Sequence, residues 1–214
     1  MLARPLAHIP ALRAPALLAP RRYFSIMPSS DPNAKNASGL TPHETKSLSE
    51  RQPEDWEKPI VQSMKELYTS QPKESTYQVY AKEAVFHDPI GIAEGIDSIR
   101  KQFNGLVKLF PRADLPKFRV LENPPSVPKS TILIDQDVAY FRDPRAAEPT
   151  KTVNSLLTIE TNAAHQIVRH TEEWDHKRET SSADGFFGTL NEYRKKLTAN
   201  TTGAFLSTKP PTEK

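Results

Sequence analysis

The spacing of apolar residues changes at Pro111, and this change constrains the fold more than any other feature of the sequence. From Ile96 to Phe110 the apolar residues recur at helical spacing, which predicts an amphipathic helix. Beyond Pro111 they alternate with polar residues, which is typical of strands with one buried face. Strands are therefore predicted over residues 118–122, 131–141, 152–160 and 166–174. The segment TNAAH (161–165) between the last two predicts a tight hairpin.

Further elements are predicted on either side of these segments. Helical spacing predicts a helix over residues 54–69, followed by a short helix that buries Tyr77, Tyr80 and Ala81. The run AVFHDP (84–89) predicts a brief strand, because proline cannot continue a strand ladder. A last helix is predicted near the C-terminus, with Asp184 as its N-cap and the apolar residues Phe186, Phe187, Leu190, Tyr193 and Leu197.

Most of these helices precede most of the strands, and this order is typical of the α+β class. We expect a curved antiparallel sheet wrapped around helices, so that the two together form a cone with an internal pocket. A concave apolar space of this kind is a common site for a small molecule.

The chain divides into one predicted domain and two tails. The periodic segments lie within residues 53–199, which form the domain and include the extra C-terminal helix. Residues 25–52 are rich in Ser, Pro, Asn and Lys and are predicted to be a disordered linker. Residues 200–214 are predicted to be a disordered tail.

Residues 1–24 contain four arginines and no acidic residue, which is typical of a mitochondrial transit peptide. The order RRYFS (21–25) places the expected cleavage near Phe24 or Ser25, and the expected location is the mitochondrial matrix. Prolines at positions 5, 10, 15 and 20 would interrupt the helix that import receptors bind. A disordered, slightly basic tail is the alternative.

The charge and composition exclude several functions. The formal net charge of +3 falls to −1 without the four N-terminal arginines, and no basic patch is present in the predicted domain, so nucleic-acid binding is not expected. The absence of cysteine excludes disulfides, thiolate metal sites and cysteine nucleophiles. No apolar run approaches the ~20 residues that a membrane span requires.

The segment YAKEAVFHDPIGIAEGIDSIRKQF (80–103) resembles the nuclear transport factor 2-like superfamily, and more narrowly its SnoaL-like and ketosteroid-isomerase-like members. IVRHTEEWD (167–175) resembles their last strand, and the order of elements matches from about Pro53 to Asp175. The resemblance implies a cone-shaped domain. It also implies that Asp88 occupies the position of the carboxylate that shuttles a proton in ketosteroid isomerases.

Two other positions depart from that pattern. Ketosteroid isomerases also hold a tyrosine and a protonated aspartic acid as donors to an oxyanion. Counting without gaps from Asp88 places Met64 at the tyrosine position, and Ser155 falls at or near the aspartic-acid position. A thioether cannot donate a hydrogen bond, so steroid-isomerase chemistry is not favoured.

The alternation of the last strand predicts further site residues. Val168, His170, Glu172 and Trp174 share one face, which we expect to be concave, whereas Ile167, Arg169, Thr171 and Glu173 share the other. The resemblance implies an inward acidic residue on this strand, and Glu172 matches it. The predicted catalytic residues are Asp88, His170 and Glu172, and the predicted pocket residues are Met64, Phe86, Phe103, Tyr140, Ser155, Leu157 and Trp174. We expect His87 to point away from the pocket.

These residues leave more than one function open. In an enzyme, burial would raise the pKa of the carboxyls and allow isomerase, cyclase or hydrolase chemistry on a small, largely apolar molecule. Alternatively, Glu172 and His170 form a satisfied polar cluster, Asp88 caps the turn before Gly91, and the domain is a non-catalytic mitochondrial interaction or scaffold module, with a homodimer through the outer sheet face. Asp88, His170 and Glu172 could bind a metal, but their spacing does not require one, and no cofactor is expected.

Overall fold

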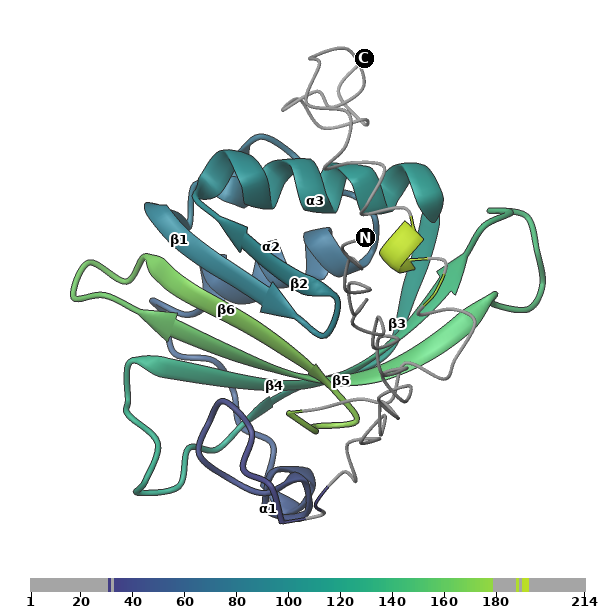
Figure 1. The fold of residues 1–214 in the computed structure, drawn as a ribbon. Coiled ribbons are helices and arrows are strands. Elements are labelled where there is room, and N and C mark those ends of the chain that lie inside the picture. Colours follow the sequence, from purple (N-terminus) through teal and green to yellow (C-terminus); the bar gives the residue numbers. More distant parts are fainter. Residues whose placement is uncertain (1–30, 32, 179–187, 189, 193–214) are drawn as a thin grey trace, which may run out of the picture.

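One sheet forms the framework of the structure, a computed structural model that describes residues 31, 33–178, 188 and 190–192. Its strands are β1 (Tyr80–Asp88), β2 (Gly91–Glu94), β3 (Arg112–Leu121), β4 (Thr131–Phe141), β5 (Lys151–Thr161) and β6 (Ile167–Trp174). Their order is β2-β1-β6-β5-β4-β3 (Figure 1). Neighbouring strands are antiparallel except β1 and β6, which run parallel. The α+β prediction is therefore confirmed, with a mixed rather than purely antiparallel sheet.

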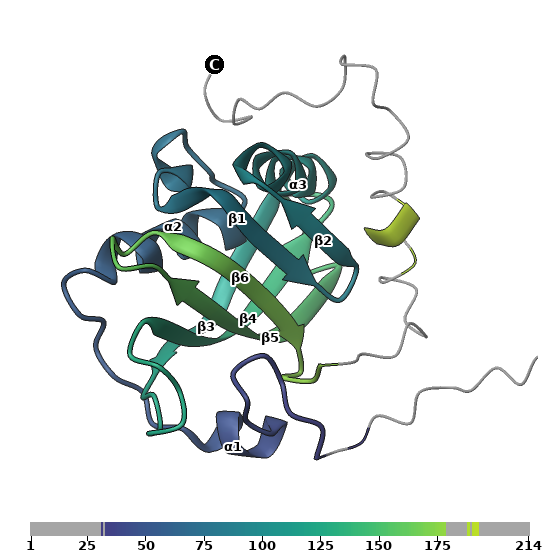
Figure 2. The same ribbon diagram turned by 60° about the vertical axis from the view of Figure 1, so that its left-hand side comes forward.

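Helices lie on both sides of this sheet. On one side are α2 (Lys58–Tyr68) and α3 (Ile96–Leu109), whereas α1 (Pro42–Ser47) lies against the opposite side (Figures 1 and 2). We call the side toward α2 and α3 the inner face and the side toward α1 the outer face. In both views the sheet bends around the inner helices, as the predicted cone requires.

Some elements differ in extent from the prediction. The short helix predicted after α2 is a single 3-10 turn, η1 (Ser75–Tyr77), and Tyr80 instead begins β1. β3 begins at Arg112, earlier than predicted, because a register shift between Asp114 and Lys117 interrupts the alternation of its first half. The edge strand β2 was too short to produce a periodic pattern.

Apolar side chains form a core on each face of the sheet. The inner core includes residues of α2, α3 and all six strands of the described sheet. A smaller outer core consists of Leu40, Leu121, Val127, Leu133 and Leu156, with Leu48 packed against it. Since successive residues of β4 point to opposite faces, the two cores together explain why nearly every residue of that strand is buried.

The outer core depends on residues 33–52, which we call the outer strap. Leu40 is buried in this core, and Thr41 and Glu44 form a capping box that begins α1. Further along, Glu50 forms a β-bridge with Leu121 at the end of β3. The prediction of a disordered linker over residues 25–52 is therefore wrong for the outer strap, because its few apolar residues cover the outer face. Residues 25–30 and 32 lie outside the described residues.

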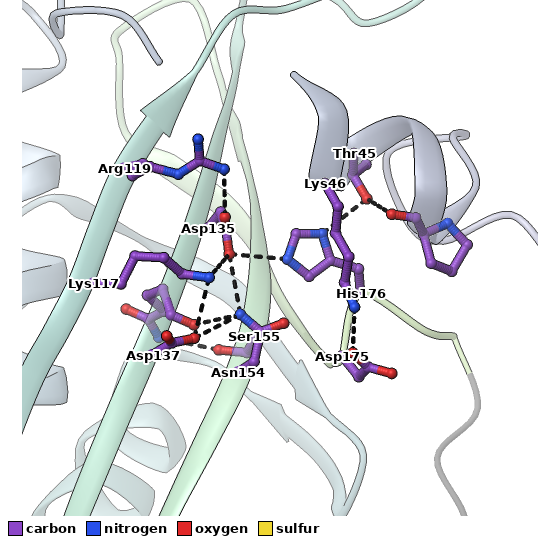
Figure 3. A network of polar contacts seen from close by, with 12 residues as sticks. Thr45, Lys46, Lys117, Arg119, Asp135, Asp137, Asn154, Ser155, Asp175 and His176 are labelled. Atoms are coloured by element: carbon purple, nitrogen blue, oxygen red, sulfur yellow. Dashed lines mark hydrogen bonds and ion pairs between the residues drawn. The ribbon is translucent and has the colours of Figure 1, made fainter. Parts of the chain in front are cut away.

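A buried polar network holds the outer strap on the sheet (Figure 3). Nε2 of His176 lies 3.1 Å from Oδ1 of Asp135 on β4, and Nδ1 lies 2.8 Å from the hydroxyl of Thr45 on α1. Asp135 also accepts hydrogen bonds from Arg119 (2.7 Å) and contacts Lys117 (3.0 Å). Burial alone would raise the pKa of Asp135, but these partners hold it far below its usual range. Part of the outer face is thus occupied by the chain itself.

The start of β6 departs from simple alternation. Ile167 is fully buried in the inner core, whereas Val168 is 37% exposed, so the predicted inward position of Val168 is wrong. The pairing with β5 shifts between Glu160 and Thr161, which leaves Val168 as the extra residue of a bulge. From Arg169 onward the register is regular, and the predicted inward positions of His170 and Glu172 hold.

Most of the predicted C-terminal helix and the whole predicted C-terminal tail lie outside the described residues, as does the predicted transit peptide. Gly188 and residues 190–192 have helical geometry, and Leu190 packs against the inner core. In the part of the chain that the structure describes, no helix is long and apolar enough to cross a membrane.

Candidate functional site

Glu172 is the acidic group at the centre of the inner face. It lies on β6, is 7% exposed, and accepts a 2.9 Å hydrogen bond from the hydroxyl of Tyr68 in the last turn of α2. The sheet pairing places Glu172 opposite Leu157 of β5, so a central strand holds it against the inner helices. A carboxyl at this place is removed from water and depends on protein groups for stabilisation.

His170 connects two tyrosines beneath Glu172. The hydroxyl of Tyr80 lies 2.9 Å from Nδ1 of His170, and that of Tyr68 lies 3.3 Å from Nε2. Burial lowers the pKa of His170 to about 3, so the ring is neutral near pH 7 and carries one N–H. Because Tyr68 donates its proton to Glu172, Nε2–H of His170 must donate to Tyr68, and Nδ1 must accept from Tyr80.

The environment shifts the acidity of Glu172 into the neutral range. Burial is the largest cause, and the charge of Asp88 adds to it; together they raise the pKa of Glu172 to about 7. Hydrogen bonds from Tyr68, Ser155 and Trp174 act in the opposite direction, because they stabilise the charged carboxylate. Glu172 can therefore both take up and release a proton near neutral pH.

Asp88 ends β1 and has a structural role that is evident from its contacts. Its Oδ1 accepts from the backbone N–H of Ile90 (2.9 Å) and Gly91 (2.8 Å), and its Oδ2 accepts from Nε2 of Gln102 (2.7 Å). The alternative prediction, that Asp88 caps the turn before Gly91, describes this geometry. Its charge nevertheless acts on Glu172 and on Tyr140. The neighbouring His87 is exposed, as expected.

The predicted pocket residues gather on the inner face. Five of them are buried in the inner core, namely Met64, Phe86, Phe103, Tyr140 and Leu157, while Ser155 is buried and Trp174 is partly buried against that core. The ring centroids of Phe86 and Phe103 are 5.0 Å apart, and Phe103 stacks on His170 at 6.1 Å. The polar cluster therefore lies in largely aromatic surroundings.

Three polar residues of this region, Tyr68, Tyr80 and Gln136, are not among the site residues predicted from the sequence. Tyr68 follows Met64 by four positions, so the two lie on the same side of α2. The count from Asp88 therefore found the right side of the helix, one turn away from the tyrosine that faces Glu172. Gln136 lies on β4 opposite Ser155, and its Nε2 donates to the hydroxyl of Ser155 at 3.3 Å.

We name Tyr68, Tyr80, Ser155, His170 and Glu172 the inner polar cluster. Among the residues that the structure describes, no three or more His, Asp or Glu side chains are grouped so that they could hold a metal ion. The metal alternative for Asp88, His170 and Glu172 thus has no support in the geometry. The arrangement suits proton transfer, because one titratable carboxyl is joined through hydrogen bonds to neutral donors.

Comparison with known proteins gives matches only at the level of structure. No family model matches the sequence, and no curated protein matches it. A nuclear transport factor 2-like protein of unknown function from Cytophaga hutchinsonii is 11% identical, with a TM-score of 0.42, and the match covers 58% of this chain and 93% of that one. A protein of the SnoaL-like family from Agrobacterium tumefaciens is 14% identical, with a TM-score of 0.43 and coverage of 56% and 98%.

A further match is a protein from Catenulispora acidiphila with a ketosteroid-isomerase-like fold, whose structure is a complex with trimethylamine. It is 14% identical, with a TM-score of 0.41, and the match covers 53% of this chain and 82% of that chain. At these levels of identity and similarity the matches describe a general arrangement of helices and sheet and carry no functional information.

Proposed function

We propose that the inner face of the cone binds a small, largely apolar molecule and that Glu172 acts on it as a general acid or base. The observation that carries this proposal is a buried carboxyl whose pKa is raised to about 7 among aromatic side chains. A general acid or base is most effective when its pKa lies near the working pH. A carboxyl buried only for packing would be replaced at less cost by an apolar residue.

The inner polar cluster would support this role by fixing the carboxyl in place. The hydroxyl of Tyr80 donates a hydrogen bond to His170, His170 donates one to Tyr68, and Tyr68 donates one to Glu172. When Glu172 takes a proton from a substrate, the hydrogen bonds to it weaken, and they strengthen again when it returns the proton. This exchange fits isomerase, cyclase and hydrolase reactions equally, so the proposal extends to acid/base chemistry and not to one reaction.

A second candidate function is a scaffold without chemistry. It is favoured by the fact that Asp88 and Glu172 already have hydrogen-bond partners within the protein. In that case the inner polar cluster would fix the orientation of α2 on the sheet, and any functional contact would be made by the protein surface.

Native mass spectrometry of the purified protein tests these two functions. We expect a small molecule to accompany the wild type, and its occupancy to fall about tenfold in Glu172→Gln, while Tm changes by less than about 5 °C. Glu83→Gln, at an exposed position of β1, is the control and should leave the occupancy unchanged. An unliganded wild type, together with a large loss of Tm in Glu172→Gln, would favour the scaffold.

We also propose that the protein acts in the mitochondrial matrix after removal of residues 1–24. The support is the run of arginines without acidic residues and the order RRYFS. The outer strap begins at residue 33, so the expected cleavage leaves it whole. N-terminal sequencing of the protein from purified mitochondria should find a start near Phe24 or Ser25; a chain that begins at Met1, or is excluded from mitochondria, would contradict the proposal.

A further inference from the structure

Gln136 carries an unpartnered polar atom on the inner face of the sheet. Its side chain is fully buried, and Oε1 has no hydrogen-bond partner among the residues that the structure describes. Its neighbours at alternate positions, Ile134 and Val138, belong to the inner core, and the β4–β5 register is regular here. Alternation therefore directs Gln136 to the same side of the sheet as Glu172.

The orientation of the amide follows from the groups around it. Nε2 of Gln136 donates a hydrogen bond to the hydroxyl oxygen of Ser155 at 3.3 Å. The NH₂ group is thus the end of the amide that meets Ser155. The carbonyl oxygen of Gln136 is the end without a partner in the described part of the chain.

The sheet places Gln136 beside the candidate catalytic group. Gln136 pairs with Ser155 on β5, and Ser155 pairs with Trp174 on β6, so the three form one row across the central strands. Glu172 lies on the same face of β6, two positions before Trp174. A molecule that contacts Glu172 would therefore lie within a strand spacing or two of Gln136.

An apolar residue would fill this position without leaving a buried acceptor unpaired. Buried amide oxygens nearly always have a partner, and one without a protein partner is satisfied by a ligand or water. Four other buried side-chain atoms lack a partner among the described residues. Thr158 Oγ1 and Arg119 Nε lie on residues whose alternation assigns them to the outer face, away from Glu172, whereas Asn123 Oδ1 lies beyond the end of β3 and Arg100 Nε lies on α3. Gln136 is therefore suited to accept a hydrogen bond from a molecule on the inner face.

We infer that Gln136 is a specificity residue that selects ligands bearing a hydroxyl or N–H group, and that it accepts a hydrogen bond from this group while the apolar part of the ligand lies among the aromatic side chains. The inference rests on the proposed function, since it assigns the ligand class of the same site. A ligand without a donor would leave the oxygen of Gln136 unpaired and would bind less tightly for its size.

Phenol and toluene are a suitable pair of probes, because they have similar size and differ in one hydrogen-bond donor. Their dissociation constants are measured by ligand titration for the wild type and for Gln136→Met, which keeps the length of the side chain and removes the acceptor. We expect the ratio of the toluene to the phenol constant to fall about tenfold in Gln136→Met. Thr158→Val, which removes an unpartnered buried hydroxyl on the outer face, is the control and should leave the ratio unchanged.

A second measurement needs no variant of Gln136. In the wild type, the NMR signals of the Gln136 side-chain amide should shift when phenol is added and stay in place with toluene. If both probes bind, an unchanged ratio in Gln136→Met, or an amide signal that responds equally to both probes, would overturn the inference and leave the proposed function standing. If neither probe binds the wild type, small-molecule binding on the inner face fails, and the inference fails with it.

Discussion

The hydroxyl of Tyr68 lies 2.9 Å from Oε2 of Glu172, although 104 positions of sequence separate the two residues. The bond joins the end of α2 to a central strand of the sheet. It therefore connects two layers of the fold and also affects the pKa of Glu172. Because the hydroxyl stabilises the charged form of Glu172, Tyr68 opposes the burial that raises the pKa of that group.

Tyr68→Phe should therefore raise the pKa of Glu172 above its value of about 7. The variant also leaves the ring N–H of His170 without its acceptor, so we expect a loss of about 1–3 kcal/mol in the free energy of unfolding. An NMR titration of the Glu172 carboxyl carbon measures the pKa. Tyr77→Phe is the control, since the hydroxyl of Tyr77 bonds Asn104 instead. An unchanged pKa in Tyr68→Phe would show that the bond does not act on the carboxyl.

Asp88→Asn should move the same pKa in the opposite direction. The asparagine keeps an acceptor for the N–H groups of Ile90 and Gly91, but it removes the negative charge that disfavours ionisation of Glu172. We expect the pKa of Glu172 to fall toward its ordinary value, with a change in stability within about 1 kcal/mol. Asp97→Asn makes the same change of charge at an exposed position of α3 and should have no effect. A rise in the pKa of Glu172 would contradict this assignment of Asp88.

Glu172 also makes stability depend on pH in a defined direction. Its pKa is about 7 in the folded state against an ordinary value of 4.5, so the folded state binds the proton more tightly between these values. This contribution is fully present below about pH 4.5 and is lost as the pH rises through 7. His170 acts oppositely: its pKa is about 3 when folded and 6.5 ordinarily, so its stabilisation is lost as the pH falls.

The two groups oppose each other between about pH 4.5 and 6.5, and Glu172→Gln removes one of them. We expect the stability of Glu172→Gln relative to the wild type to increase by about 3 kcal/mol from pH 4.5 to pH 7.5. Urea unfolding at a series of pH values measures the difference. A difference that stays constant over this range would mean that Glu172 ionises in the folded protein as it does in water.

The fold could be predicted from the sequence where apolar and polar residues alternate regularly, because the alternation shows which residues of a strand point to the same face of the sheet. β4, β5 and most of β6 alternate regularly, so the inward positions of Ser155, His170 and Glu172 follow from the order of residues alone. The bulge at Val168 could not be predicted, because the insertion depends on how β6 meets its neighbours. Likewise, a count along the chain found Met64 and missed Tyr68, since the rotation of α2 against the sheet is set by packing.

The outer strap could not be predicted from the sequence for a different reason. Its composition is polar, and only a few apolar residues, Leu40 and Leu48 among them, pack on the sheet. A prediction of disorder depends on the average polarity of a segment. The packing of the outer strap on the sheet depends instead on a few contacts with residues that are distant in the sequence. His176, which lies far from the outer strap along the chain, provides one of those partners by bonding Thr45, and Asp135 holds His176 in place.

His176→Ala should release the outer strap while the inner polar cluster stays in place. The ring of His176 is fully buried between Thr45 and Asp135, and left-handed φ angles of 55° at Asp175 and 63° at His176 turn the chain back onto the sheet. Loss of the ring leaves a cavity and two polar groups without this partner, so we expect a cost of about 2–4 kcal/mol.

Hydrogen exchange of backbone amides shows which part of the structure is destabilised in His176→Ala. The N–H of Ala37 donates to Glu173 at 2.8 and 3.0 Å, and its protection should fall in His176→Ala more than that of amides in β4 and β5. His43→Ala, at an exposed position of α1, is the matched control and should keep the protection of Ala37. The pKa of Glu172 should stay near 7 in both variants, because the sheet separates the two faces. If the protection of Ala37 persists in His176→Ala, the apolar contacts of the outer strap hold it without the polar network.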